Sequence, residues 1–352
     1  MKRYKKGSEE RKSLFVGIDL HRLRWQVTIR TEDVELFNGS IPGRWEALQR
    51  VLERYGGYAI QVVYEAGYFG FWLHDRLQES GIECIVTPPS LLPIEYGNHV
   101  KTDRRDSRKL AQLLAKGLLK RVWVPSLEER YHRQVIRRRR QLIGDRVRTQ
   151  NRIKAELRLY GIELPEPVSK WSKAYVVNLS RLQFNNRWMQ ESFRQLLEEY
   201  EFLSQQIVEQ TKLVRELAET ELYQGRVKIL RSHPGIGLLA AMELLLELQD
   251  VARFRRAEDL AAYVGLTPAQ YSSADKIRMG RITAIGKNAL RGTLVEVAWR
   301  VIGKDPGMRR TYERIKVRAG SKRAIVAIAR RVLLTSRRML LENRPYQFKI
   351  AA

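Results

Sequence analysis

Two aspartates lie three residues apart in a strongly basic stretch of the chain. Residues 101–108 read KTDRRDSR, and the acids Asp103 and Asp106 stand among Lys101, Arg104, Arg105 and Arg108. Good helix formers follow, and a spacing of three at the start of a helix puts both carboxylates on one face. Carboxylate oxygens bind hard cations such as Mg²⁺. The surrounding basic side chains would allow a phosphate group to bind at the same site. The pair therefore suits metal-assisted phosphate chemistry; the alternative is that both acids only complement the helix dipole.

Two further acids end β-rich runs. Asp19 follows LFVGI, and Glu65 follows VVY. Because the ends of neighbouring strands lie side by side, we expect both carboxylates to face the crevice that also receives Asp103 and Asp106. Four such groups could hold two Mg²⁺ ions about 4 Å apart, which activate an attacking oxygen and stabilise a leaving one. The alternative for Asp19 and Glu65 is an ordinary surface position at a strand end.

A polar stretch near residue 270 offers a nucleophile. It reads YSSADKIRMGRIT and contains Ser272 and Ser273. Five cations flank these serines and could neutralise a phosphate under attack: Lys276, Arg278, Arg281, Lys287 and Arg291. No base lies nearby in the sequence, so a metal-bound hydroxide or a carboxylate from elsewhere would have to take the hydroxyl proton. The alternative is a turn with two solvated serines.

The acids are placed by an alternation of strand-like and helix-like segments between residues 13 and 120. SLFVGIDL, WQVTIR and VELFNGSI predict a three-stranded antiparallel meander. The next segments predict helix, strand, helix, strand and helix in turn: RWEALQRVLERYG, AIQVVYEAG, FGFWLHDRLQESG, IECIVTP and DRRDSRKLAQLLAKGLLK. This order is typical of an α/β domain with a mixed sheet.

The second third of the chain is predicted to be helical. Residues 126–225 contain two long helical segments interrupted by Pro165 and Pro167, the second with heptad-like spacing. They predict a coiled-coil arm or dimerising hairpin; the alternative is two helices packed on their own domain. The run of Arg137, Arg138, Arg139 and Arg140 could contact a nucleic-acid backbone or form a solvated helix face.

Residues 226–345 are predicted to be mostly helical and open with a Gly-rich turn. In HPGIG, which precedes an apolar helix, Gly235 and Gly237 leave backbone N–H groups open to a phosphate. A packing turn between two helices, without any ligand, is the alternative.

The composition of the chain indicates which kinds of partner it binds. The 352 residues include 65 Lys and Arg against 39 Asp and Glu, a net charge of +26 with 44% hydrophobic residues. Such a charge on a chain able to form a core indicates a polyanion, DNA or RNA foremost. No run of about 18 apolar residues could span a membrane, and the N-terminus does not resemble a signal peptide, so we expect a cytoplasmic protein without a membrane partner. The single Cys84 predicts a buried strand residue, and the scattered histidines predict no histidine-based metal site.

The motifs together resemble a known family. GID, YEA, KTDRRD, HPGIG, GLTPAQYSSADKIRMGRIT and NALR, in this order, are similar to the bridge-RNA-guided recombinases of bacterial insertion sequences, the group that includes the Piv invertase. The resemblance runs over nearly the whole chain.

The resemblance implies a RuvC-like domain of the RNase H fold over residues 13–122, with a Mg²⁺-binding DEDD tetrad of Asp19, Glu65, Asp103 and Asp106 that holds two ions. It implies a coiled-coil oligomerisation segment over 126–225 and a C-terminal transposase domain over 226–345, with Ser273 as nucleophile. It further implies a homo-oligomer, a dimer or tetramer in which one subunit's acids meet another's serine. A noncoding bridge RNA would pair with donor and target DNA.

The chain departs from the family pattern after the serine. Ala274 stands where the family commonly has glycine, and a left-handed turn there would be strained by about 1 kcal/mol. Tyr271 favours Ser273 over Ser272 as the matching serine. Two other functions stay open on the residues alone: a metal-dependent DNA junction nuclease that uses water, and a non-catalytic nucleic-acid-binding scaffold.

Overall fold

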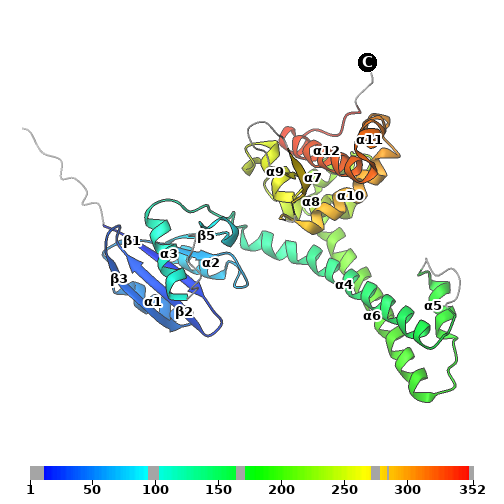
Figure 1. Ribbon diagram of the computed structural model, residues 1–352, viewed down its shortest axis with the longest axis horizontal. Helices are drawn as coiled ribbons and strands as arrows, with labels where there is room; N and C mark the ends of the chain where they lie inside the picture. The colour runs from blue at the N-terminus through cyan, green and yellow to red at the C-terminus, as the bar shows by residue number, and fades with distance from the viewer. Residues whose placement is uncertain (1–11, 94–102, 164–170, 271–277, 284, 349–352) are drawn as a thin grey trace, which may run out of the picture. The chain divides into compact units, whose positions relative to one another are not determined.

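The chain forms two compact units, Met1–Val124 and Pro125–Ala352. The computed structural model describes residues 12–93, 103–163, 171–270, 278–283 and 285–348 (Figure 1). The second unit contains both the long helical segment and the C-terminal residues.

The first unit is built on a five-stranded mixed sheet, as predicted. Its strands are β1 (Ser13–Leu20), β2 (Arg24–Arg30), β3 (Glu35–Pro42), β4 (Ala59–Glu65) and β5 (Glu83–Thr87), in the order β3-β2-β1-β4-β5. The first three strands form the antiparallel meander, whereas β4 pairs parallel to β1 and β5 parallel to β4. Two parallel pairs therefore bring the carboxyl ends of β1, β4 and β5 to one edge.

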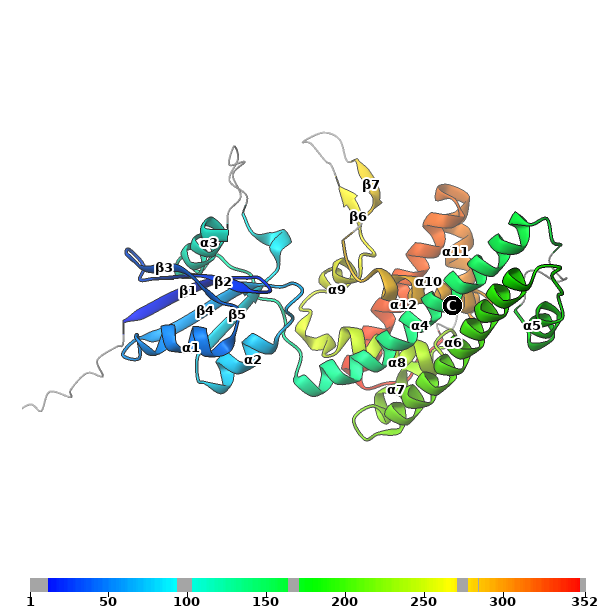
Figure 2. The same ribbon diagram turned by 90° about the horizontal axis from the view of Figure 1, so that it is seen from below.

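Helices cover both faces of this sheet. Leu14, Val16 and Ile18 share a core with α1 (Trp45–Glu53) and α2 (Trp72–Glu79). The alternate residue Phe15 packs instead with Leu110 of α3 (Asp103–Ala115). Figure 2 shows α3 on one side of the sheet and α1 and α2 on the other. A short 3-10 turn, Pro89–Leu91, follows β5.

Cys84 is buried in β5, as predicted. Burial, with the nearby Asp75 and Glu83 carboxylates, raises the pKa of its thiol to about 12.

The second unit begins with two long helices that lie side by side (Figures 1 and 2). Ser126 and Glu129 cap each other at the start of α4 (Leu127–Leu159), and the Asn186 side chain caps α6 (Arg187–Glu219). Leu142 of α4 packs on Leu203 and Ile207 of α6, and the short α5 (Lys173–Ser180) joins a second apolar cluster at the far end of the pair. Coiled-coil geometry and a role in oligomerisation stay predictions.

The C-terminal helices surround one apolar core that also receives Ile136 of α4. They are α7 (Gln224–Arg231), α8 (Leu238–Leu248), α9 (Ala257–Val264), α10 (Asn288–Ile302), α11 (Pro306–Ala319) and α12 (Ser321–Glu342), with a 3-10 turn at Val251–Arg253. Strands β6 (Pro268–Gln270) and β7 (Met279–Ile282) form a small antiparallel pair. Within the described residues, no helix is both long enough and apolar enough to cross a membrane.

Candidate active site

Asp19 and Glu65 occupy matching positions at the ends of neighbouring parallel strands. Ile18 of β1 is in register with Tyr64 of β4, so the residues that follow them also lie side by side. Side chains alternate between the faces of a strand, and Asp19 is therefore on the same face as Phe15, as Glu65 is on the same face as Val63. Phe15 and Val63 both pack against α3. The two acids thus lie on the sheet face that α3 covers.

The helix α3 approaches β1 closely because residue 17 is glycine. A Cβ atom on Gly17 would lie 2.2 Å from the backbone oxygen of Ser107 and 2.5 Å from the backbone nitrogen of Ala111. Beside this contact, the buried hydroxyls of Thr28 and Ser107 share a hydrogen bond of 2.9 Å. Asn38 Nδ2 also donates to the Thr28 hydroxyl. The contact fixes the first turn of α3, which carries Asp103 and Asp106, next to the end of β1.

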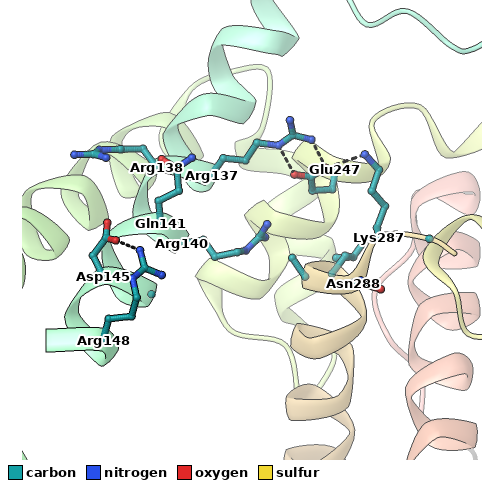
Figure 3. A pocket seen from close by; sticks show the side chains of 13 residues that line it. Arg137, Arg138, Arg140, Gln141, Asp145, Arg148, Glu247, Lys287 and Asn288 are labelled. Atoms are coloured by element: carbon teal, nitrogen blue, oxygen red, sulfur yellow. Dashed lines mark hydrogen bonds and ion pairs between the residues drawn. The ribbon is translucent and has the colours of Figure 1, made fainter. Parts of the chain in front are cut away.

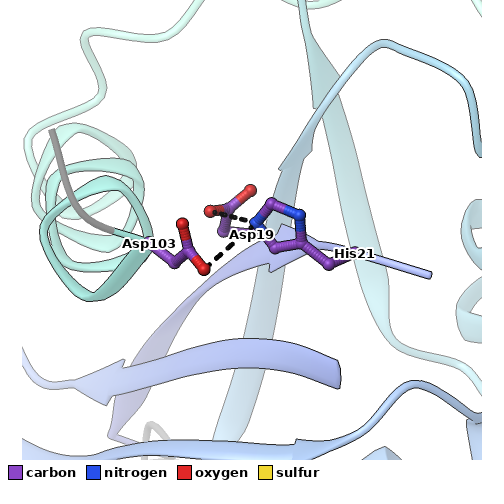
Figure 4. A group of neighbouring side chains, drawn as sticks. All are labelled: Asp19, His21 and Asp103. Atoms are coloured by element: carbon purple, nitrogen blue, oxygen red, sulfur yellow. Dashed lines mark hydrogen bonds and ion pairs between the residues drawn. The ribbon is translucent and has the colours of Figure 1, made fainter. Parts of the chain in front are cut away.

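The result is a cluster of Asp19, His21 and Asp103 (Figure 4). His21 Nε2 lies 3.1 Å from Asp19 Oδ2 and 3.4 Å from Asp103 Oδ2. One donor atom from each of the three side chains lies within 4.8 Å of the others. Among the described residues, Glu65 and Asp106 are not part of this tight group, although Asp106 is close enough to act on Asp19 electrostatically.

Asp19 has the electrostatics of a cation-binding carboxylate. Burial raises its pKa, and repulsion from Asp103 and Asp106 raises it further, while the charge and hydrogen bond of His21 act in the opposite direction. A cation at this place would relieve both the repulsion and the loss of hydration. The donor set of two carboxylates and an imidazole fits a divalent cation, and imidazole extends the choice from Mg²⁺ to Mn²⁺.

His21 differs from what the sequence predicts, because no histidine was expected at a metal site. Its place in the sequence carries one weak signal: it follows Asp19 by two residues, just beyond the end of β1. No spacing motif marks it, since its partner Asp103 comes from a distant helix.

The basic residues around the tetrad have partners within the unit. Arg104 Nε donates to Asn38 Oδ1 at 2.8 Å, and Arg108 forms a two-point ion pair with Glu35. Arg105 is exposed and also has a partner. Lys101 lies outside the described residues.

The candidate nucleophile Ser273 also lies outside the described residues, as do Ser272 and Lys276. Arg278 and Arg281 are exposed just before and within β7. Arg291 of α10 donates to the backbone oxygens of Gly265 and Thr283, so it ties the loop before α10 to the end of α9.

Three of the four arginines in the run Arg137–Arg140 of α4 contact other helices of the second unit, unlike residues of a solvated helix face. Arg137 forms a two-point ion pair with the buried Glu247 of α8, and Arg140 pairs with Glu243 one turn earlier. Arg139 donates to Thr211 of α6 at 2.8 Å, whereas Arg138 is exposed. Contact with nucleic acid stays a prediction for all four.

The HPGIG turn joins α7 to α8 as a helical hairpin. A Cβ atom on Gly235 would lie 2.9 Å from the backbone oxygen of Val297, so this glycine permits close packing on α10. Gly237 has open space around it and precedes the first residue of α8. The geometry favours a packing role for Gly235 and leaves phosphate contact at Gly237 a prediction.

Comparisons with known proteins match both units. Residues 16–162 match the model of a DEDD transposase domain of the IS110 type, and residues 227–313 match the model described as transposase, IS116/IS110/IS902 family.

Transposases and a gene-inverting protein are among the similar proteins. A putative transposase y4qE of Sinorhizobium fredii is 29% identical over 81% of this chain and 71% of its own length. The transposase for insertion sequence element IS1533 of Leptospira borgpetersenii is 28% identical over 68% of this chain and 71% of its own length. The pilin gene-inverting protein of Moraxella bovis is 31% identical over 36% of this chain and 40% of its own length. Residues 16–162 and 227–313 are thus each similar to insertion-sequence transposases of the IS110 and IS116/IS110/IS902 type.

Proposed function

We propose that this protein is an RNA-guided DNA recombinase that moves an insertion sequence by cutting and rejoining DNA through a serine phosphodiester intermediate. The observation that carries the proposal is the meeting of Asp19 and Asp103 at one edge of a mixed sheet, beside the strand end that carries Glu65. The strand order and the acid positions fit an RNase H-like domain of the RuvC type.

The proposed metal site consists of Asp19, Glu65, Asp103 and Asp106, with His21 as an additional neighbour. A divalent cation bound there would offset the negative charge of the scissile phosphate and polarise it. The carboxylates of Asp19 and Asp103 would hold the cation, and the close contact of α3 at Gly17 would keep the two carboxylates near each other. We expect the full tetrad to bind two Mg²⁺ ions.

In the proposed step, the Ser273 hydroxyl oxygen forms a bond to phosphorus while the bond from phosphorus to one DNA oxygen breaks. The serine proton passes to a carboxylate, and the departing DNA oxygen takes up a proton. Arg278, Arg281, Lys287 and Arg291 are proposed to bind the phosphates on either side. Strand rejoining reverses the step with a different DNA hydroxyl as attacking group.

A noncoding RNA encoded by the element is the proposed guide, and a homo-oligomer the proposed assembly. Base pairing would choose the sites, which suits a protein whose charge is spread along the chain rather than confined to one reading helix. The second candidate is a metal-dependent junction nuclease, favoured by the same acids because they need no serine if water attacks.

The deciding experiment combines the full-length protein, the RNA flanking its gene, Mg²⁺ and labelled junction DNA, and looks for a protease-sensitive protein–DNA adduct. We expect an adduct with wild type, and none with Ser273→Ala or Asp19→Asn. Ser272→Ala and the exposed Asp33→Asn are the matched controls and should keep it. Cleavage without an adduct, lost with Asp19→Asn and kept in Ser273→Ala, would instead establish the junction nuclease. Tight DNA binding without cleavage by every variant would favour the scaffold.

Metal binding is tested separately by calorimetric titration with Mn²⁺. Asp19→Asn and Asp103→Asn should each weaken Mn²⁺ binding, and Asp33→Asn should not. Unchanged binding in both site variants would contradict the assignment of the metal site.

A further inference from the structure

A basic groove lies in the second unit, where α4 passes the start of α10. The groove has a volume of about 720 Å³ and is lined on the α4 side by Arg137, Arg138, Arg140 and Arg148. Gly286, Lys287 and Asn288 line it on the other side (Figure 3). Five cations thus face two lining carboxylates, Asp145 and Glu247.

Two of the arginines are fixed by ion pairs with carboxylates of α8. Arg137 uses Nε and Nη2 on the Glu247 carboxylate, whose side chain is 3% exposed, and Arg140 pairs with Glu243. A guanidinium has five N–H donors, so a two-point pair leaves donors for another acceptor. Such an arginine loses little side-chain freedom when it binds an anion, because its position is already fixed.

Two of the other cations, Arg138 and Arg148, are more open to solvent. Arg138 is exposed and has no carboxylate partner among the described residues. Arg148 pairs with Asp145 one turn away on the same helix, and its side chain is still 65% exposed. Lys287 is 3.7 Å from Glu247 and lies over the ring of Tyr263. Arg138 and Arg148 can therefore move toward a ligand, whereas Lys287 is held by its two contacts.

The backbone adds to the positive potential. Lys287 is the N-cap of α10 and provides no side-chain cap. The Asn288 N–H donates to the Gly286 oxygen, and the N–H groups of Ala289 and Leu290, the next residues of this 15-residue helix, lie at this end of the groove. The preceding Gly286 has a φ of 126°, and a Cβ atom there would lie 2.7 Å from the Gly265 nitrogen. The start of α10 is therefore set firmly against the end of α9.

We propose that this groove binds the sugar–phosphate backbone of DNA, with two phosphates held between α4 and the start of α10. Fixed arginines, exposed arginines and the N–H groups at the start of a helix all suit phosphate oxygens. The inference rests on the DNA substrate of the proposed function and not on the serine chemistry. The groove positions the duplex in the second unit, independently of sequence.

The test is a DNA titration of the full-length protein by fluorescence anisotropy at several KCl concentrations. The variant is Arg138→Gln with Arg148→Gln, which removes two groove cations and keeps the buried pairs of Arg137 and Arg140. The control is Arg158→Gln with Arg181→Gln, an equal change of charge at exposed arginines of the same unit. Arg158 lies 20 residues beyond Arg138 on α4, a distance of about 30 Å at the rise of an α-helix.

We expect the groove variant to bind DNA about tenfold more weakly at 0.1 M salt and to lower the salt slope by about 2, since each phosphate contact contributes about 0.9. Weakening should be equal for element ends and unrelated duplexes. The control should bind within about twofold of wild type. An equal loss in the two variants would overturn the proposal, because net charge alone would then explain it.

The same titration with RNA of equal length tests the occupant. A groove variant that loses affinity for RNA and keeps its affinity for DNA would overturn the assignment to DNA. At saturating DNA the groove variant should still form the serine adduct, whereas Ser273→Ala should bind DNA with the wild-type salt slope. Binding and chemistry can thus fail separately.

Discussion

Gly17→Ala is predicted to disable the first unit by moving α3. The new Cβ would meet the Ser107 carbonyl oxygen at 2.2 Å and the Ala111 nitrogen at 2.5 Å, and both are backbone atoms. Ordinary van der Waals contacts of a Cβ atom lie at 3.4–4 Å, so α3 must retreat by roughly 1 Å. Overpacking of this kind costs about 1–3 kcal/mol of unfolding free energy, and a misplacement of about 1 Å near reacting groups lowers rates by about a hundredfold.

Two measurements check this prediction. Urea unfolding should show the loss of stability, and Mn²⁺ titration should show weaker binding at the site of Asp19 and Asp103. Gly57→Ala is the control, since its added methyl group would meet nothing within 4 Å. A Gly17→Ala protein with wild-type stability and wild-type Mn²⁺ affinity would refute the close packing of α3 on β1.

Three further changes test the interior of both units. Glu247→Gln should lower the unfolding free energy by about 2 kcal/mol in urea, because the two-point pair with the partly exposed Arg137 is broken. Burial raises the pKa of Glu247, but Arg137 and neighbouring cations outweigh burial, so the pKa is lowered overall. The pair's stabilisation is therefore present above pH 4.5 and is lost below it. The unfolding free energy of the variant should fall less steeply than that of wild type as the pH is lowered. Burial lowers the pKa of His233 from 6.5 to about 4, so the unfolding free energy should fall as the pH is lowered from 6.5 to 4. His233→Gln should remove up to about 3 kcal/mol of this pH dependence, measured by unfolding curves at several pH values. Ser107→Ala should cost about 1 kcal/mol in the same assay, through the lost hydrogen bond to Thr28, and a variant as stable as wild type would show that this bond contributes nothing.

The sheet and the position of the acids were predictable because they depend on local patterns. Continuous apolar runs mark β1 and β4, and an acid directly after each run marks the strand ends at which Asp19 and Glu65 lie. The basic helix with Asp103 and Asp106 was predictable from its composition. These signals each span fewer than about ten residues, within the reach of sequence periodicity.

The remaining features depend on contacts between distant segments. Glu243 and Glu247 interrupt an apolar helix in the sequence, and only the structure shows that they hold arginines more than 100 positions earlier. His21 joins the acids through Asp103, and Gly17 matters because of a helix that comes 90 residues later. No periodicity within one segment can reveal partners of this kind.

The buried Cys84 makes the chain convenient for spectroscopy. It is the one cysteine of the sequence, and with a pKa near 12 its thiol forms almost no thiolate at neutral pH. A cysteine introduced at an exposed position of either unit would thus be the reactive one. Paired dyes attached at one such position in each unit would report, by energy transfer, how the distance between the units changes when nucleic acid binds.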